Sequence, residues 1–230
     1  MSVRRALAGG LLLACLMLAQ GAAAAPTEDR LLPVDQYTSD KARTLAMTHA
    51  GALRELSAGI YHCMPWVEVQ KHSIGFFRPK HVTRDDRYLS LRIYIEQDPS
   101  PEFARLRVED RASAMFSRYA GPLLRRMTKD PAVAADSALD GFTLILEWMK
   151  QVPRAGDRPV HETIAVFIET TTARDYLTGA DSITEMAAKT RVLGFDGETA
   201  LGTIRLAVWD DNFVKTYKVA NYVLEPGVTC

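Results

Sequence analysis

Histidine side chains in the first half of the chain are its most obvious candidates for chemistry. His62, His72 and His81 lie within twenty residues of one another, together with Cys63. Imidazole and thiolate groups bind zinc and copper. Their spacing matches no compact metal-binding template, however, and a histidine is more often solvated or hydrogen-bonded in the core. The sequence therefore predicts no cofactor and no metal site. His62, His72 and His81 are the candidate ligands for the alternative, a protein that does bind a metal.

Glu147 and His161 could form a general-base pair. They belong to two apolar runs, 142–149 and 161–169, which are rich in β-branched and aromatic residues and are joined by a turn-rich linker. Such runs are typical of a β-hairpin. If the linker turns symmetrically, Met149 lies opposite His161, and Glu147 becomes the diagonal neighbour of this histidine. A carboxylate can orient an imidazole as a general base, although the same pair could simply be the polar end of a strand.

Aromatic residues around the first two expected strands form a third group of candidates. Trp66, Tyr88 and Tyr94 lie on or beside these strands, and Tyr94 falls on the polar face of its strand. Aromatic side chains supply large contact areas in ligand and protein interfaces, but they also pack in cores. We therefore treat these three as candidates for binding a ligand or a partner.

Cysteine usage favours one disulfide. Beyond the N-terminal segment the chain has only Cys63 and the terminal Cys230. In an oxidising compartment an even pair is more often bridged than free. The bridge would hold the last residue beside the end of the first helix. Two separate thiols, one of them a ligand or a nucleophile, are the alternative.

The N-terminal segment has the features of a secretory signal peptide. Arg4 and Arg5 precede an apolar stretch, and small residues follow it up to Ala24, after which we expect cleavage. The stretch is shorter than the roughly 20 residues of a spanning helix. We therefore expect a periplasmic or secreted protein without a transmembrane segment in the mature chain.

The residues around Cys15 offer an alternative to a cleaved signal. They resemble the cleavage site of a bacterial lipoprotein, in which the cysteine becomes the lipid anchor. Leu13 is bulky for its place two residues before that cysteine, and the apolar run continues beyond Cys15. Both observations favour the soluble exported form.

The balance of charge argues against nucleic acid as a partner. The whole chain has 28 basic and 28 acidic residues, and its hydrophobic content of 47% is ordinary for a globular protein. Removing residues 1–24 leaves 26 basic and 28 acidic residues, a net charge of −2. Nucleic-acid binding normally requires a basic face.

Periodicity and turn signals give the remaining elements. Residues 25–38 are expected to form an extended lead-in and residues 39–230 a single domain. Ser39 and Ser100 can cap helices that begin at the next residue, and 182–189 is a short helix candidate. The expected strands are 66–77, 88–97, 142–149, 161–169, 202–208 and 213–224, and Asp196 followed by Gly197 predicts a hairpin turn.

These elements predict an α+β fold. We expect a mostly antiparallel sheet of about six or seven strands with two main helices packed on one face, in the order α-β-β-α-β-β-(α)-β-β(-β). No long crossover between parallel strands is expected. The second main helix should turn Arg111 towards solvent and should kink or end at Gly121 and Pro122, before a last turn to Met127. The central hairpin should bury Phe142, Leu144, Leu146 and Trp148 against both helices.

No catalytic motif accompanies this fold. The sequence has no nucleophile elbow, phosphate loop, His-Glu-x-x-His or Cys-x-x-Cys. Export and near-neutral charge then favour a non-catalytic protein that binds an unknown small ligand or envelope protein, or that has an envelope-accessory role. An exported hydrolase or metal-dependent enzyme with a histidine–carboxylate site is the alternative. The hairpin face that carries Glu147, His161 and Thr163 is where we expect function.

Overall fold

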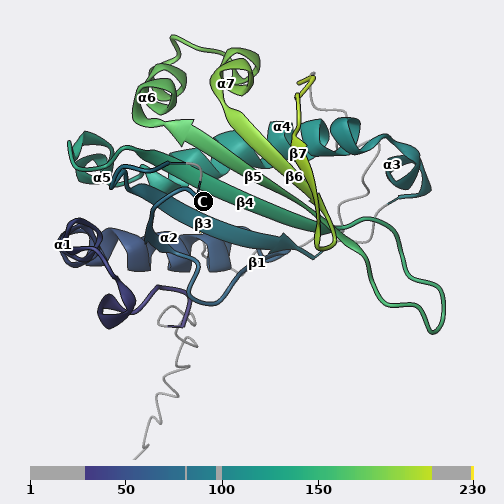
Figure 1. Ribbon diagram of the computed structural model, residues 1–230, viewed down its shortest axis with the longest axis horizontal. Coiled ribbons are helices and arrows are strands. Elements are labelled where there is room, and N and C mark those ends of the chain that lie inside the picture. The colour runs from purple at the N-terminus through teal and green to yellow at the C-terminus, as the bar shows by residue number, and fades with distance from the viewer. Residues whose placement is uncertain (1–28, 81, 97–99, 209–228) are drawn as a thin grey trace, which may run out of the picture.

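A computed structural model describes residues 29–80, 82–96, 100–208 and 229–230, and within them one sheet forms the centre of the molecule (Figure 1). Its strands follow the order β1-β3-β4-β5-β6-β7, and β2 pairs with β3 beside β1. The strands are β1 (Val67–Val69), β2 (Gly75–Phe77), β3 (Tyr88–Ile95), β4 (Gly141–Met149), β5 (His161–Glu169), β6 (Arg191–Asp196) and β7 (Thr199–Thr203).

Two long helices lie against the back of this sheet as Figure 1 shows it. They are α2 (Ala50–Cys63) and α4 (Val108–Met127). The other described helices are η1 (Val34–Gln36), α1 (Asp40–Thr48), α3 (Pro101–Arg105), α5 (Pro131–Ala135), α6 (Thr170–Thr178) and α7 (Ile183–Lys189). Ser39, Ser100 and Ser182 each accept a hydrogen bond from a backbone N–H of the first turn that they cap. The predicted α+β class is confirmed, as is the short helix near 182–189.

The central hairpin forms the core that its pattern predicts. Phe142, Leu144, Leu146 and Trp148 of β4 are at most 1% exposed. Val166, together with its neighbours on the same face of β5, is equally buried. Burying each such side chain contributes roughly 1.5–3 kcal/mol relative to leaving it in water. The register also agrees with expectation, because Met149 pairs with His161.

One pair of strands contradicts the expected topology. β3 and β4 are parallel neighbours, with Tyr88 opposite Gly141 and Ile95 opposite Trp148. The prediction of a sheet without a crossover is therefore wrong. The chain between the two strands contains α3, α4 and α5, and this length allows it to cross the back of the sheet and re-enter beside β3 in the same direction.

The first expected strand is in fact two short ones. β1 pairs with the end of β3 and β2 pairs with its beginning, both antiparallel. Between them the chain turns at His72, whose φ of 53° is in the left-handed region that histidine occupies more readily than most residues. The turn interrupts the strand predicted over 66–77.

Near the end of the described chain, fewer residues form strand than the sequence predicted. The turn at Asp196 and Gly197 joins β6 to β7, as predicted, but β7 ends at Thr203 and residues 204–208 are not strand. The predicted strand 213–224, the signal peptide with Cys15, and His81 lie outside the described residues.

Helix α4 continues through Gly121 and Pro122 and ends at Met127, where its last turn was expected. Gly121 has a packing role instead, because a Cβ at this position would collide with the hydroxyl of Tyr176 on α6. The guanidinium of Arg125 lies 5.0 Å from the ring centroid of the same tyrosine. These contacts hold α6 against the last turns of α4.

Arg111 on α4 is buried, contrary to the prediction that it faces solvent. Its Nε donates to Glu162 Oε2 at 2.6 Å, and its Nη1 donates to the carbonyl of Leu106. Trp148 Nε1 donates to the same Glu162 oxygen at 3.2 Å. The pair lies between helix and sheet, where an unpaired charge would be costly. It fixes α4 against β5 and the bend between α3 and α4.

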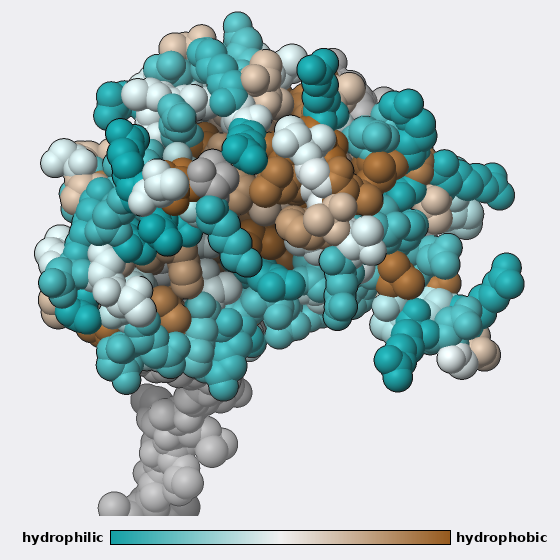
Figure 2. Space-filling model, in the orientation of Figure 1, coloured by the Kyte–Doolittle hydropathy of each residue, from teal (hydrophilic) through white to brown (hydrophobic). Residues whose placement is uncertain are grey.

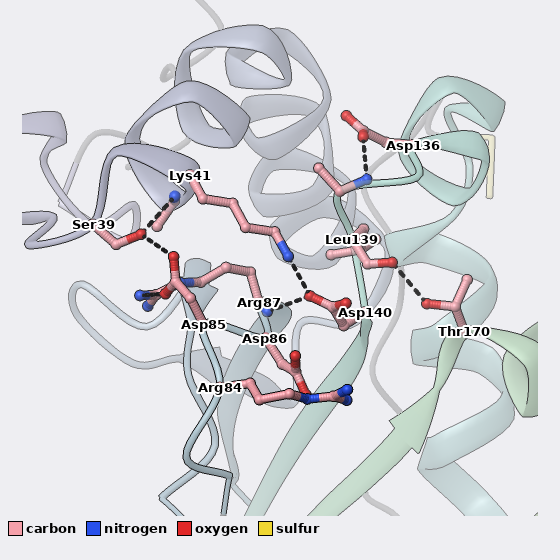
Figure 3. A network of polar contacts seen from close by, with 12 residues as sticks. Ser39, Lys41, Arg84, Asp85, Asp86, Arg87, Asp136, Leu139, Asp140 and Thr170 are labelled. Atoms are coloured by element: carbon pink, nitrogen blue, oxygen red, sulfur yellow. Dashed lines mark hydrogen bonds and ion pairs between the residues drawn. The ribbon is translucent and has the colours of Figure 1, made fainter.

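A polar network ties the start of α1 to the sheet (Figure 3). Asp140, just before β4, accepts from Lys41 Nζ at 2.6 Å and from the backbone N–H of Arg87 at 2.7 Å. The hydroxyl of Ser39 donates to Asp85 Oδ2 at 2.8 Å, and this bond is the main cause that lowers the pKa of the Asp85 carboxyl. The contacts tie the start of α1 to the segments that lead into β3 and β4.

The first main helix divides at His49 into α1 and α2. His49 Nε2 lies 2.8 Å from Asp136 Oδ2. The pKa of Asp136 is lowered by the hydrogen bond from the backbone of Ala138 and by this contact with His49. After the break, α2 runs on to Cys63.

Cys63 and Cys230 lie at disulfide distance, as predicted from the presence of two cysteines beyond the N-terminal segment. Their Sγ atoms are 2.16 Å apart and their Cα atoms 5.7 Å. The last residue is therefore held at the end of α2. Over the part of the chain that the structure describes, no helix has the length and hydrophobicity needed to cross a bilayer.

Candidate functional site

A groove about 930 Å³ in volume lies on the sheet face opposite α2 and α4. Figure 2 views this face directly and shows hydrophobic residues gathered in its middle with hydrophilic residues around them. Strands β3 to β6 form the floor, and the β1–β2 turn with the segment after β2 forms one rim. The solvated face of an antiparallel sheet is ordinarily polar, so apolar residues here need a reason.

The apolar floor is built from neighbouring strands. Ile145 of β4 pairs with Ala165 of β5, which pairs with Leu193 of β6. Phe167 and Phe195 extend the surface along β5 and β6. A contiguous apolar patch that is surrounded by polar residues is typical of a surface that binds a ligand or another protein.

The rim of the groove is cationic. Lys71 and His72 come from the β1–β2 turn, and Arg78 and Lys80 come from the segment after β2. Arg92 of β3 also lines the groove, whereas none of the lining residues is an aspartate or a glutamate. The chain as a whole has equal numbers of acidic and basic residues, so the groove concentrates positive charge locally.

Glu147 and His161 lie beside this groove and touch each other. His161 Nδ1 is 3.2 Å from Glu147 Oε1, and Arg92 Nη2 donates to Glu147 Oε2 at 2.7 Å. The ring of Tyr94 lies 5.1 Å from that of His161. If His161 Nδ1–H donates to the carboxylate, its Nε2 is left as a proton acceptor. The geometry is thus compatible with a general base and equally with a polar strand end.

The two candidate metal ligands that the structure describes, His62 and His72, belong to different parts of the fold. His62 is in the last turn of α2, where its ring packs edge-on against Tyr61 at 5.2 Å. His72 lines the groove, and His81 is outside the described residues. Among the residues that the structure places, no group of three or more His, Cys, Asp or Glu could hold a metal ion.

The three candidate aromatic residues have different positions. Tyr88 is 7% exposed, and burial raises the pKa of its phenol, as expected for a core residue. Trp66 is partly buried and packs against the core beside β1. Tyr94 lies on the open sheet face, next to His161.

Sequence reasoning missed the floor and the rim of the groove. A signal for the floor was present, because residues 144–146 and 165–167 are apolar at every position instead of alternating. For the rim there was no signal, because Lys71, Arg78 and Lys80 look like ordinary surface residues in the sequence. They line the groove only because the turn at His72 places their segment beside the sheet face.

No family model, curated protein or solved structure matches this chain.

Proposed function

We propose that this protein is exported and that it binds a ligand or partner in the groove, in a non-catalytic or envelope-accessory role. Support for export comes from the signal-peptide pattern and from a cysteine pair at disulfide distance, which suits an oxidising compartment. Support for binding comes from a groove whose volume of about 930 Å³ is within the usual range of small-molecule sites.

The observation that carries the proposal is the row of apolar side chains across the open sheet face. Ile145, Ala165 and Leu193 form a cross-strand row whose contacts with water are unfavourable. Each square ångström of apolar surface covered by a ligand gains roughly 25 cal/mol. The simplest explanation for such a row is that it binds an apolar group of a ligand.

A neutral, environment-sensitive dye such as 1-N-phenylnaphthylamine is expected to bind the groove. Leu193→Glu should weaken binding at least about tenfold, because it places a charge in the apolar floor. Fluorescence titration of the mature protein measures this. Leu201→Glu on β7 is the matched control, since Leu201 is 41% exposed and outside the groove.

Circular dichroism should show that both variants keep the wild-type fold. Absence of dye binding to the wild-type protein, or equal binding by both variants, would contradict a binding role for the groove.

The contact between His161 and Glu147 favours a second candidate, an exported hydrolase. If it is correct, the mature protein hydrolyses a p-nitrophenyl ester, and His161→Ala reduces the rate by roughly a hundredfold because the general base is lost. His62→Ala is the control, since this histidine lies on α2 away from the groove lining.

Equal rates for the wild type and His161→Ala would remove the hydrolase. Metal analysis of the purified protein tests the metal-dependent version, for which stoichiometric zinc or copper is the required result.

A further inference from the structure

We infer that the ligand of the groove is an anionic amphiphile, with one acidic headgroup at the cationic rim and an apolar tail on the floor. This inference rests on the proposed binding function and specifies the chemistry of its ligand. It is carried by the charge of the lining residues and by a change from polar to apolar across the strands.

Three cations of the rim are available to an anion. Lys71, Arg78 and Lys80 are exposed, and no acidic side chain in the described part of the chain pairs with any of them. The one hydrogen bond that Arg78 makes within this part is to the carbonyl of Thr83, at 3.4 Å. Cations that line a cleft without acidic neighbours create a local potential that attracts anions.

The fourth cation, Arg92, is already neutralised. Glu147 accepts from both its Nε, at 3.3 Å, and its Nη2, at 2.7 Å. An anion is therefore attracted to the rim formed by the β1–β2 turn and the segment after β2, and not to the end of the groove near Glu147. This places the headgroup on the β3 side of the floor.

Polarity decreases from this side towards β6. On the groove face β3 supplies Ser90, whose strand neighbour on β4 is Thr143. Of the next strands, β5 supplies Phe167, with Thr163 further along it, and β6 supplies Leu193. A ligand that extends from the rim across the strands thus passes from cations to hydroxyl groups and then to apolar side chains, in the order that an amphiphile requires.

Single-stranded nucleic acid is the competing class of ligand, because aromatic residues and cations on a sheet also bind stacked bases. A nucleic acid carries a charge at every nucleotide and needs cations along its whole path. Among the residues that line the groove, the cations without an acidic partner are confined to one rim, and the far side of the floor carries Leu193 and Phe195. This distribution favours one headgroup over a chain of phosphates.

Displacement of the neutral dye from the mature protein tests the inference. Dodecanoate and dodecyl phosphate, below their micellar concentrations, should displace it at least about tenfold more effectively than dodecanol, and dodecylamine should be the weakest competitor. The double variant Arg78→Gln/Lys80→Gln should lose this preference while binding dye and dodecanol as before. Lys129→Gln/Arg158→Gln, with exposed residues outside the groove, is the matched control and should keep the preference.

Each outcome distinguishes the two proposals. Equal displacement by dodecanol and by the anions overturns the inference and leaves the binding function intact, whereas a failure of the dye itself to bind removes both. Stronger displacement by oligothymidylate than by dodecanoate also overturns the inference and assigns the groove to nucleic acid. If the inference holds, the better of the two anions identifies the headgroup as carboxylate or phosphate.

Discussion

Glu162→Ala is expected to lower the free energy of unfolding by about 3–5 kcal/mol, the usual effect of removing one partner from a buried ion pair. The side chain of Glu162 is 1% exposed and that of its partner Arg111 is 6% exposed. The substitution leaves the guanidinium without its counter-charge and Trp148 Nε1 without the acceptor of its hydrogen bond. Urea denaturation followed by circular dichroism measures the change.

Two further variants separate the loss of the pair from the loss of a carboxylate on the same strand. Glu169→Ala, at the exposed end of β5, should change stability by less than about 0.5 kcal/mol. Arg111→Met/Glu162→Leu should recover most of the loss, because no charge then remains buried. A loss below about 1 kcal/mol for Glu162→Ala would show that the pair does not stabilise the helix on the sheet.

Cys230→Ser is expected to lower the free energy of unfolding by about 2–5 kcal/mol. The bond joins residues 167 positions apart, so its loss releases most of the mature chain from a closed loop in the unfolded state. Thermal and urea denaturation of the mature oxidised protein measure the difference. A reducing agent should lower the stability of the wild type to that of the variant.

The companion variant is Cys63→Ser, which breaks the same bond from the other side. Its stability and that of the double variant should equal that of Cys230→Ser, because all three lose one shared bond. If the reductant has no effect on the wild type, or if the double variant is less stable than each single variant, the cysteines act separately and not as a bridge.

Local sequence patterns determined the buried face of the sheet. Alternation in β3 and in the central hairpin predicts which side chains are buried, because successive residues of a strand point to opposite faces. Turn chemistry predicts the β6–β7 hairpin, and the caps Ser39 and Ser100 predict where two helices begin. The contact between Glu147 and His161 also follows from local spacing, because the hairpin sets its own register.

Contacts between distant segments required the tertiary structure. Arg111 has the sequence context of a surface helix, and its burial depends on the position of Glu162, 51 residues away. The parallel pairing of β3 with β4 depends on how the three intervening helices cross the sheet, and no short pattern encodes that path. The burial of Arg111 and the order of the strands both depend on how whole helices and strands pack. The energy of that packing is a sum over many residues that are distant in the sequence.

The groove combines both kinds of information. Its floor is visible in the sequence as strand residues that are apolar on both faces, such as Ile145 and Phe167. Its cationic rim is assembled only when the turn at His72 brings residues 71–80 over β3. The strands could be derived from the sequence because strand periodicity is local, whereas the charge above them is decided by a backbone turn whose effect appears only in the folded chain.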